Sequence, residues 1–206
     1  MTPAACHLIF RLEGVVTQTF EGALFSVVAG STAVADPKAR LAVRDLASAM
    51  RSGKLDWTGL CSRAALILGV REDGSSLGER ILNSLRVDAG IEELLISING
   101  VLDSWLFCEI DGNDIVSAME RLGIERCIPR TRWLFSSEDR QRLRVDVPRE
   151  LIAAIAERVK APRETLLWID DRPRVTAALI RAGMNAVAFV DAFRLQRNLV
   201  LRGLLQ

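Results

Sequence analysis

Apolar and polar residues follow two patterns along this chain, one typical of strands and one typical of helices. Five short runs of mainly apolar residues, several of them β-branched or aromatic, have the length of β-strands. They cover residues 7–12, 105–110, 131–135, 166–169 and 186–190. Most are hydrophobic almost throughout, which is typical of strands in a parallel sheet covered on both faces. The pattern therefore predicts a parallel sheet.

The segments between the later runs have apolar residues three or four positions apart, as one face of a helix does. Such patterns cover about residues 114–123, 148–162 and 173–183. Pro148 and Pro173 suit the first turn of a helix, and Gly123 and Gly183 suit its end. Strand followed by helix, repeated, is the layout of a doubly wound α/β fold.

Residues 17–95 break this alternation, because they carry helical patterns and no convincing strand. A helical insert after the first strand would overhang the carboxyl ends of the strands, where open α/β sheets bind ligands. We therefore predict a doubly wound parallel sheet formed by residues 1–16 and 96–206, with a small helical cap at residues 17–95.

Composition narrows the class of protein. Of the 206 residues, 50% are hydrophobic and 26% are charged, as in globular proteins, and the formal net charge is only +1. Nothing in this balance attracts nucleic acid or anionic lipid, and no basic stripe accompanies the four tryptophans. The longest apolar stretch, which starts at Leu24, is about a dozen residues, well short of the roughly 20 that span a bilayer. Since the first residues also lack the basic start of a signal peptide, we expect a cytoplasmic protein with no nucleic-acid or membrane partner.

The cysteines and the single histidine offer little chemistry. No C-x-x-C pair is present, so neither a zinc knuckle nor a thioredoxin-type motif is available. His7 falls in a predicted strand, where a structural role is expected. We predict reduced, mostly buried thiols at Cys6, Cys61, Cys108 and Cys127.

Two segments carry a family resemblance: LIFRLEGVV at residues 8–16 and LLWIDDRPRVTAALIRAGMNAVAFVD at residues 166–191. Both resemble motifs of the haloacid dehalogenase superfamily, here called HAD. The first is similar to the family's opening strand and loop, in which one aspartate attacks phosphorus and a second, two residues later, acts as general acid and base. The second is similar to its acidic metal-binding motif. The resemblance implies a Rossmann-like core with a cap inserted after the first strand, and it extends over nearly the whole chain.

The resemblance places Arg11 at the nucleophile position and Glu13 at the acid position. A guanidinium has a pKa above about 12 and no lone pair to offer phosphorus at neutral pH. We therefore predict that the family's ordinary mechanism through an aspartyl phosphate is absent. Glu13 keeps a carboxyl group that could move a proton, or that could simply pair with a nearby cation.

Asp170 and Asp171 correspond to the acidic motif, which implies magnesium binding in active relatives. Our hypothesis is that Arg11 pairs with Asp170 or Asp171 and takes over the space and the charge of the metal. We accordingly predict no cofactor, with magnesium only if the chain is an active hydrolase.

Two further positions depart from the family pattern. A hydroxyl residue is expected at the end of the second strand, where the chain has Glu109 and Asp111 instead. The phosphate-binding lysine has no clear counterpart, and its place falls to Arg144, Arg142 or Asp146 depending on the gap. An arginine there could hold phosphate, or the basic run could be a solvated loop.

A rival placement of the first motif exists at residues 108–114, CEIDGND, where Glu109 and Asp111 flank an apolar residue. Too little chain follows Asp111 to complete the fold in the family's order, so the placement at Arg11 is preferred.

Two functions follow from these residues. The first is a HAD-like protein without phosphatase activity that serves as a ligand-sensing, regulatory or protein-interaction module. The alternative is an active hydrolase that acts on a small phosphorylated metabolite through the remaining carboxylates. The expected partner is a small phosphorylated ligand or a protein, and a homodimer would suit so apolar a chain.

Overall fold

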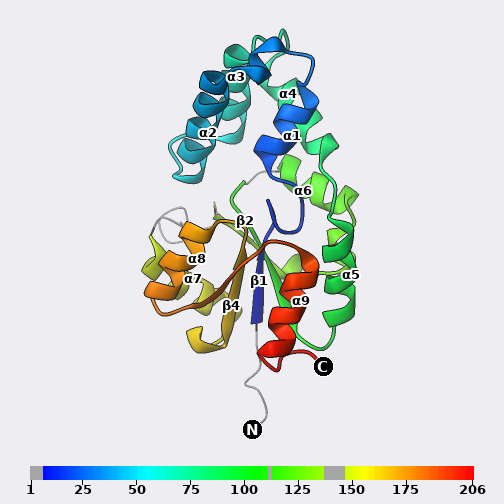
Figure 1. Ribbon diagram of the computed structural model, residues 1–206, viewed down its shortest axis with the longest axis vertical. Coiled ribbons are helices and arrows are strands. Elements are labelled where there is room, and N and C mark those ends of the chain that lie inside the picture. Colours follow the sequence, from blue (N-terminus) through cyan, green and yellow to red (C-terminus); the bar gives the residue numbers. More distant parts are fainter. Residues whose placement is uncertain (1–6, 111–112, 137–146) are drawn as a thin grey trace.

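The computed structural model describes residues 7–110, 113–136 and 147–206 (Figure 1). In this part of the chain, five parallel strands form one sheet in the order β3-β2-β1-β4-β5. They are β1 (His7–Arg11), β2 (Asp103–Cys108), β3 (Trp133–Phe135), β4 (Leu166–Asp170) and β5 (Asn185–Ala188). The predicted doubly wound parallel sheet is confirmed, although β3 starts two residues late because residues 130–132 form a short 3-10 turn.

Both faces of the sheet are buried, as the continuous hydrophobic strands require. In β1, Leu8 and Phe10 point into one apolar cluster, whereas Ile9 points into another together with Phe107 and Trp168. This alternation follows from the two-residue period of a strand. Because each face needs its own cover, helices must pack on both sides of the sheet.

The covering helices lie where their apolar faces predict. α7 (Pro148–Val159) and α8 (Pro173–Arg181) cover one face, with a proline in the first turn of each. α5 (Ala89–Ile98), α6 (Asn113–Arg121) and α9 (Ala192–Leu201) contribute to the other cluster. None of the described helices is long and apolar enough to cross a membrane.

Four helices stand beyond the carboxyl ends of the strands (Figure 1). They are α1 (Phe20–Val27), α2 (Pro37–Arg51), α3 (Trp57–Ile67) and α4 (Gly74–Ser84), and they pack on one another. Each begins after a residue whose side chain accepts a hydrogen bond from the first turn, which satisfies an otherwise free backbone N–H; these residues are Thr19, Asp36, Asp56 and Asp73. We call residues 20–84 the helical insert.

The cap was predicted to end at residue 95. Residue 95 falls inside α5, and this helix packs against α9 beside the sheet instead of joining the helical insert (Figure 1). Its apolar face, with Ile91, Leu95 and Ile98, is buried in the apolar cluster that the sheet shares with the helical insert. The division of the chain into two domains remains a prediction.

Candidate functional site

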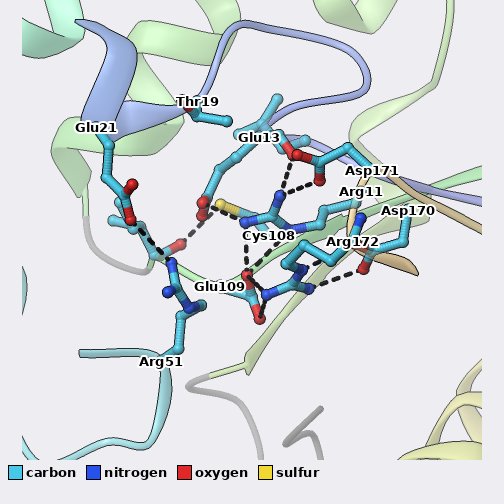
Figure 2. Close-up of polar contacts among 12 residues, drawn as sticks. Arg11, Glu13, Thr19, Glu21, Arg51, Cys108, Glu109, Asp170, Asp171 and Arg172 are labelled. Carbon is cyan, nitrogen blue, oxygen red and sulfur yellow. Dashed lines mark hydrogen bonds and ion pairs between the residues drawn. The ribbon is translucent and has the colours of Figure 1, made fainter. Parts of the chain in front are cut away.

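The sheet order brings the sequence-predicted residues to one place. Arg11 ends β1, Glu109 follows β2 and Asp170 ends β4, and these strands are neighbours in the order β2-β1-β4. Glu13 and Asp171 lie in the loops that follow β1 and β4. The five side chains therefore meet at the carboxyl edge of the sheet (Figure 2).

Arg11 is the centre of this cluster, with a side chain only 3% exposed. Its Nη2 donates to Oε2 of Glu13 at 2.6 Å, its Nε donates to Oε2 of Glu109 at 3.0 Å, and its Nη1 donates to Oδ1 of Asp171 at 2.7 Å. Nη1 also donates to the backbone carbonyl of Glu13. Each of the three guanidinium nitrogens thus donates at least one hydrogen bond to the protein.

A second guanidinium, that of Arg172, completes the cluster. Its Nε and Nη2 donate to the two carboxylate oxygens of Asp170, each at 2.8 Å, and its Nη1 donates to Glu109 at 3.0 and 3.1 Å. Trp168 Nε1 adds a further hydrogen bond to Asp170 at 3.1 Å. Glu109 is therefore shared by the two arginines (Figure 2).

Arg172 was not among the predicted site residues, although its place in the sequence carries a signal. It directly follows the acidic pair, where a long cationic side chain can fold back on the carboxylates. Of the two aspartates expected to contact Arg11, Asp171 makes the hydrogen bond, while Asp170 is bound by Arg172.

Burial and charge shift the proton affinities in opposite directions. Burial alone lowers the pKa of Arg11, but the surrounding carboxylates outweigh it and raise that pKa above its ordinary value. Burial raises the pKa of Asp170, but hydrogen bonds from Arg172 bring it below the ordinary range. Both arginines therefore stay charged and Asp170 stays ionised at neutral pH.

Glu13 behaves differently. Burial raises its pKa to about 7, even though the Arg11 guanidinium lowers it. One of its carboxylate oxygens, Oε1, is buried without any hydrogen-bond partner. Burial therefore makes Glu13 hold its proton to a higher pH than an ordinary carboxyl group does.

Gly14 fixes the approach of the first loop to Asp171. Its φ of +77° is in the left-handed region, and a Cβ built there would lie 2.3 Å from Oδ2 of Asp171. Only glycine fits this contact, because any side chain would overlap the carboxylate.

A cavity of about 300 Å³ lies between this cluster and the helical insert. Arg11, Glu13, Asp171 and Arg172 line its inner end, which we call the floor. Its walls are largely apolar and come from helices α1 to α4; the apolar residues are Phe20, Leu24, Val43, Ala47, Met50, Trp57, Leu60 and Ile81. Glu21, Arg44 and Arg51 also line it.

The cluster does not fit magnesium in this arrangement. Carboxylate oxygens are the right donors, but a magnesium ion needs them at about 2.0–2.1 Å in octahedral geometry. Here guanidinium nitrogens lie 2.7–2.8 Å from the same oxygens of Asp170 and Asp171. Within the described ranges, no three histidine, cysteine, aspartate or glutamate side chains are placed to hold a metal ion.

Several predicted positions lie outside the described residues, namely Asp111, Arg142, Arg144, Asp146 and Cys6. His7 stands at the opposite end of β1, with Nδ1 3.4 Å from Asp103. The described cysteines, namely Cys61, Cys108 and Cys127, are free and buried, as expected.

No family model matches the sequence, and no curated protein is similar enough to match it. Solved structures do match. A dehalogenase superposes with a TM-score of 0.69 at 13% identity, over 90% of this chain and 85% of its own. A HAD family enzyme from Bacteroides thetaiotaomicron, in complex with magnesium and inorganic phosphate, gives 0.67 at 11% identity, over 93% of this chain and 99% of its own. The L-2-haloacid dehalogenase from Xanthobacter autotrophicus, with chloropropionic acid covalently bound, gives 0.66 at 15% identity, over 98% and 85%. Identities this low speak for the fold alone, and the predicted fold is confirmed: this chain has the fold of the haloacid dehalogenase superfamily.

Proposed function

We propose that this chain is a HAD-fold protein without phosphatase activity that binds a small molecule in the cavity above its sheet. One observation carries the proposal: Arg11 ends β1, at the position of the family's nucleophile, with all three guanidinium nitrogens bonded to protein acceptors. A buried guanidinium with a raised pKa cannot attack an electrophile.

The charges of the cluster also argue against a phosphorylated substrate. A phosphate group would meet the carboxylates of Glu13, Glu109, Asp170 and Asp171, while both guanidiniums already donate to these carboxylates. An anion bound by Arg11 or Arg172 would have to compete with such bonds, and each charge-assisted hydrogen bond is worth roughly 1.5–3 kcal/mol. The other two arginines of the cavity, Arg44 and Arg51, lie on the walls that the helical insert provides.

The position of the cavity suggests how binding could be sensed. Its walls belong to the helical insert and its floor belongs to the ends of β1 and β4. An occupant touches both parts at once, so binding would favour one arrangement of the insert over others. This coupling is what a ligand-sensing or regulatory module requires.

The deciding experiment incubates the purified chain and its Arg11→Asp variant with magnesium and generic phosphate monoesters. The natural chain should release no phosphate above the blank. Release only by Arg11→Asp would agree with the proposal, because it would identify Arg11 as the block. Turnover by the natural chain that Glu13→Ala abolishes, and that Glu79→Ala on the exposed side of α4 preserves, would refute it.

One observation favours a second candidate, a hydrolase that uses the remaining carboxylates. A general base works best with a pKa near the working pH, and burial places the pKa of Glu13 at about 7 beside the cavity. In that case Glu13 would activate water directly. Turnover by the natural chain should then rise as pH passes through about 7 and should disappear in Glu13→Gln.

A further inference from the structure

The cavity floor has a free hydrogen-bond acceptor at Asp171. Each of the six guanidinium nitrogens of Arg11 and Arg172 donates at least one hydrogen bond to a carboxylate. None of the described residues donates to Oδ2 of Asp171, and Oε1 of Glu13 is also without a partner. Because burial raises the pKa of Glu13 to about 7, Asp171 is the acceptor of the two that stays charged below that pH.

Asp171 is the accessible member of the pair. Its side chain is 25% exposed and lines the cavity, whereas the Glu13 side chain is 4% exposed. Figure 2 shows the two carboxylates on either side of the Arg11 guanidinium. Asp171 is therefore the carboxylate that a donor in the cavity reaches more easily.

The charges at and behind the floor have a negative excess. Behind the floor lie Glu109 and Asp170, and together with Glu13 and Asp171 they outnumber the guanidiniums of Arg11 and Arg172 even when Glu13 is protonated. On the walls, Arg51 pairs with Glu21 at 3.7 Å, and Arg44 is exposed. A cation at Asp171 would reduce this excess, whereas a carboxylate or phosphate would add to it.

The walls select for an apolar body. Phe20 and Trp57 form a tilted aromatic pair with ring centroids 5.4 Å apart, and both line the cavity with six aliphatic side chains. A volume of about 300 Å³ is at the lower end of the range for small-molecule pockets. The cavity therefore suits a small molecule with one polar end.

We propose that the cavity binds a small apolar primary amine, whose ammonium group donates to the Asp171 carboxylate while its apolar part packs on Phe20 and Trp57. This inference rests on the proposed function and adds the chemical class of the ligand. A site of this kind prefers a cationic ligand, whereas an enzyme that acts on phosphate esters binds an anionic one.

The test measures binding by calorimetry with three probes of one shape and different charge. These are phenethylamine, phenethyl alcohol and hydrocinnamate, with inorganic phosphate as a fourth titrant. Phenethylamine should bind, the alcohol should bind roughly 10-fold more weakly or worse because it lacks the charge-assisted bond, and the two anions should not bind. Absence of amine binding, or an alcohol or an anion that binds as tightly as the amine, would overturn the proposal.

Two variants assign the binding to this site. Asp171→Asn should weaken phenethylamine binding roughly 10- to 100-fold, while the matched change Asp45→Asn on the exposed side of α2 should leave it unchanged. Ala47→Leu keeps all charges and fills part of the cavity, so it should also weaken the amine at least 10-fold if Asp171→Asn fails to fold. Unchanged amine binding in either variant would refute the site. These outcomes do not affect the phosphatase assay, so the two proposals can fail separately.

Discussion

Replacing Arg11 with methionine keeps much of the volume of the side chain and removes its charge. Three carboxylates lose a donor, because Glu13, Glu109 and Asp171 each accept a hydrogen bond from this guanidinium. Breaking a buried ion pair by removing one partner costs about 3–5 kcal/mol. Since 1 kcal/mol shifts the melting temperature of a chain of this size by about 2–4 °C, the variant should melt roughly 6–20 °C lower.

Thermal unfolding followed by circular dichroism at pH 8 and pH 5 tests this expectation. The loss should be larger at pH 8, because protonation of Glu13 at lower pH removes one of the uncompensated charges. Arg126→Met is the matched control: its side chain is 71% exposed and pairs with Glu92 at 3.4 Å, so it should cost less than about 1 kcal/mol. A melting temperature of Arg11→Met that equals that of Arg126→Met at pH 8 would refute the view that Arg11 neutralises the cluster.

Three further outcomes follow from the same site. The native state binds a proton at Glu13 more tightly than the unfolded chain does, because folding raises the pKa of Glu13 from 4.5 to about 7. The stability that this proton contributes is complete below pH 4.5 and is lost as pH rises through 7, by up to about 3 kcal/mol. Glu13→Gln should therefore flatten the stability measured by urea unfolding between pH 5 and pH 8, and an unchanged slope would contradict the assignment. Gly14→Ala should lower the melting temperature more than Gly53→Ala does, because both glycines have positive φ but only the first would press a Cβ against Asp171. Cys108 is buried and its pKa is well above the ordinary value, so a thiol reagent should modify it only after denaturant is added, and rapid labelling of the native chain at this residue would show that the strand end opens.

Much of the fold could be predicted from the sequence, because a buried parallel sheet leaves a strong local signal. Strands such as β1 and β4 are apolar except at their ends, since helices cover both faces. The boundary of the insert was harder to predict. α5 has the same helical pattern as its predecessors, and only packing against α9 assigns it to the sheet side.

The centre of the candidate site could be predicted from the family resemblance. The resemblance placed Arg11 at the nucleophile position, beside Asp170 and Asp171, and the structure has the hydrogen bond from Arg11 to Asp171. The second guanidinium was missed for a physical reason. Arg172 donates to Glu109, which is 63 residues earlier in the sequence. The two residues are close because β2 and β4 lie on either side of β1 in the sheet, and the local sequence does not show this order.

Sharing Glu109 between Arg11 and Arg172 makes the two positions interdependent in evolution. Each guanidinium keeps the common carboxylate neutralised when the other is absent, so the costs of substituting them should not add. A lone change of Arg11 to aspartate would place another negative charge beside Glu13 and Asp171, while Arg172 would still hold Asp170. In such a variant a metal ion would still have to displace Arg172 from Asp170. Arg172 would therefore hinder metal binding even after position 11 had regained a carboxylate.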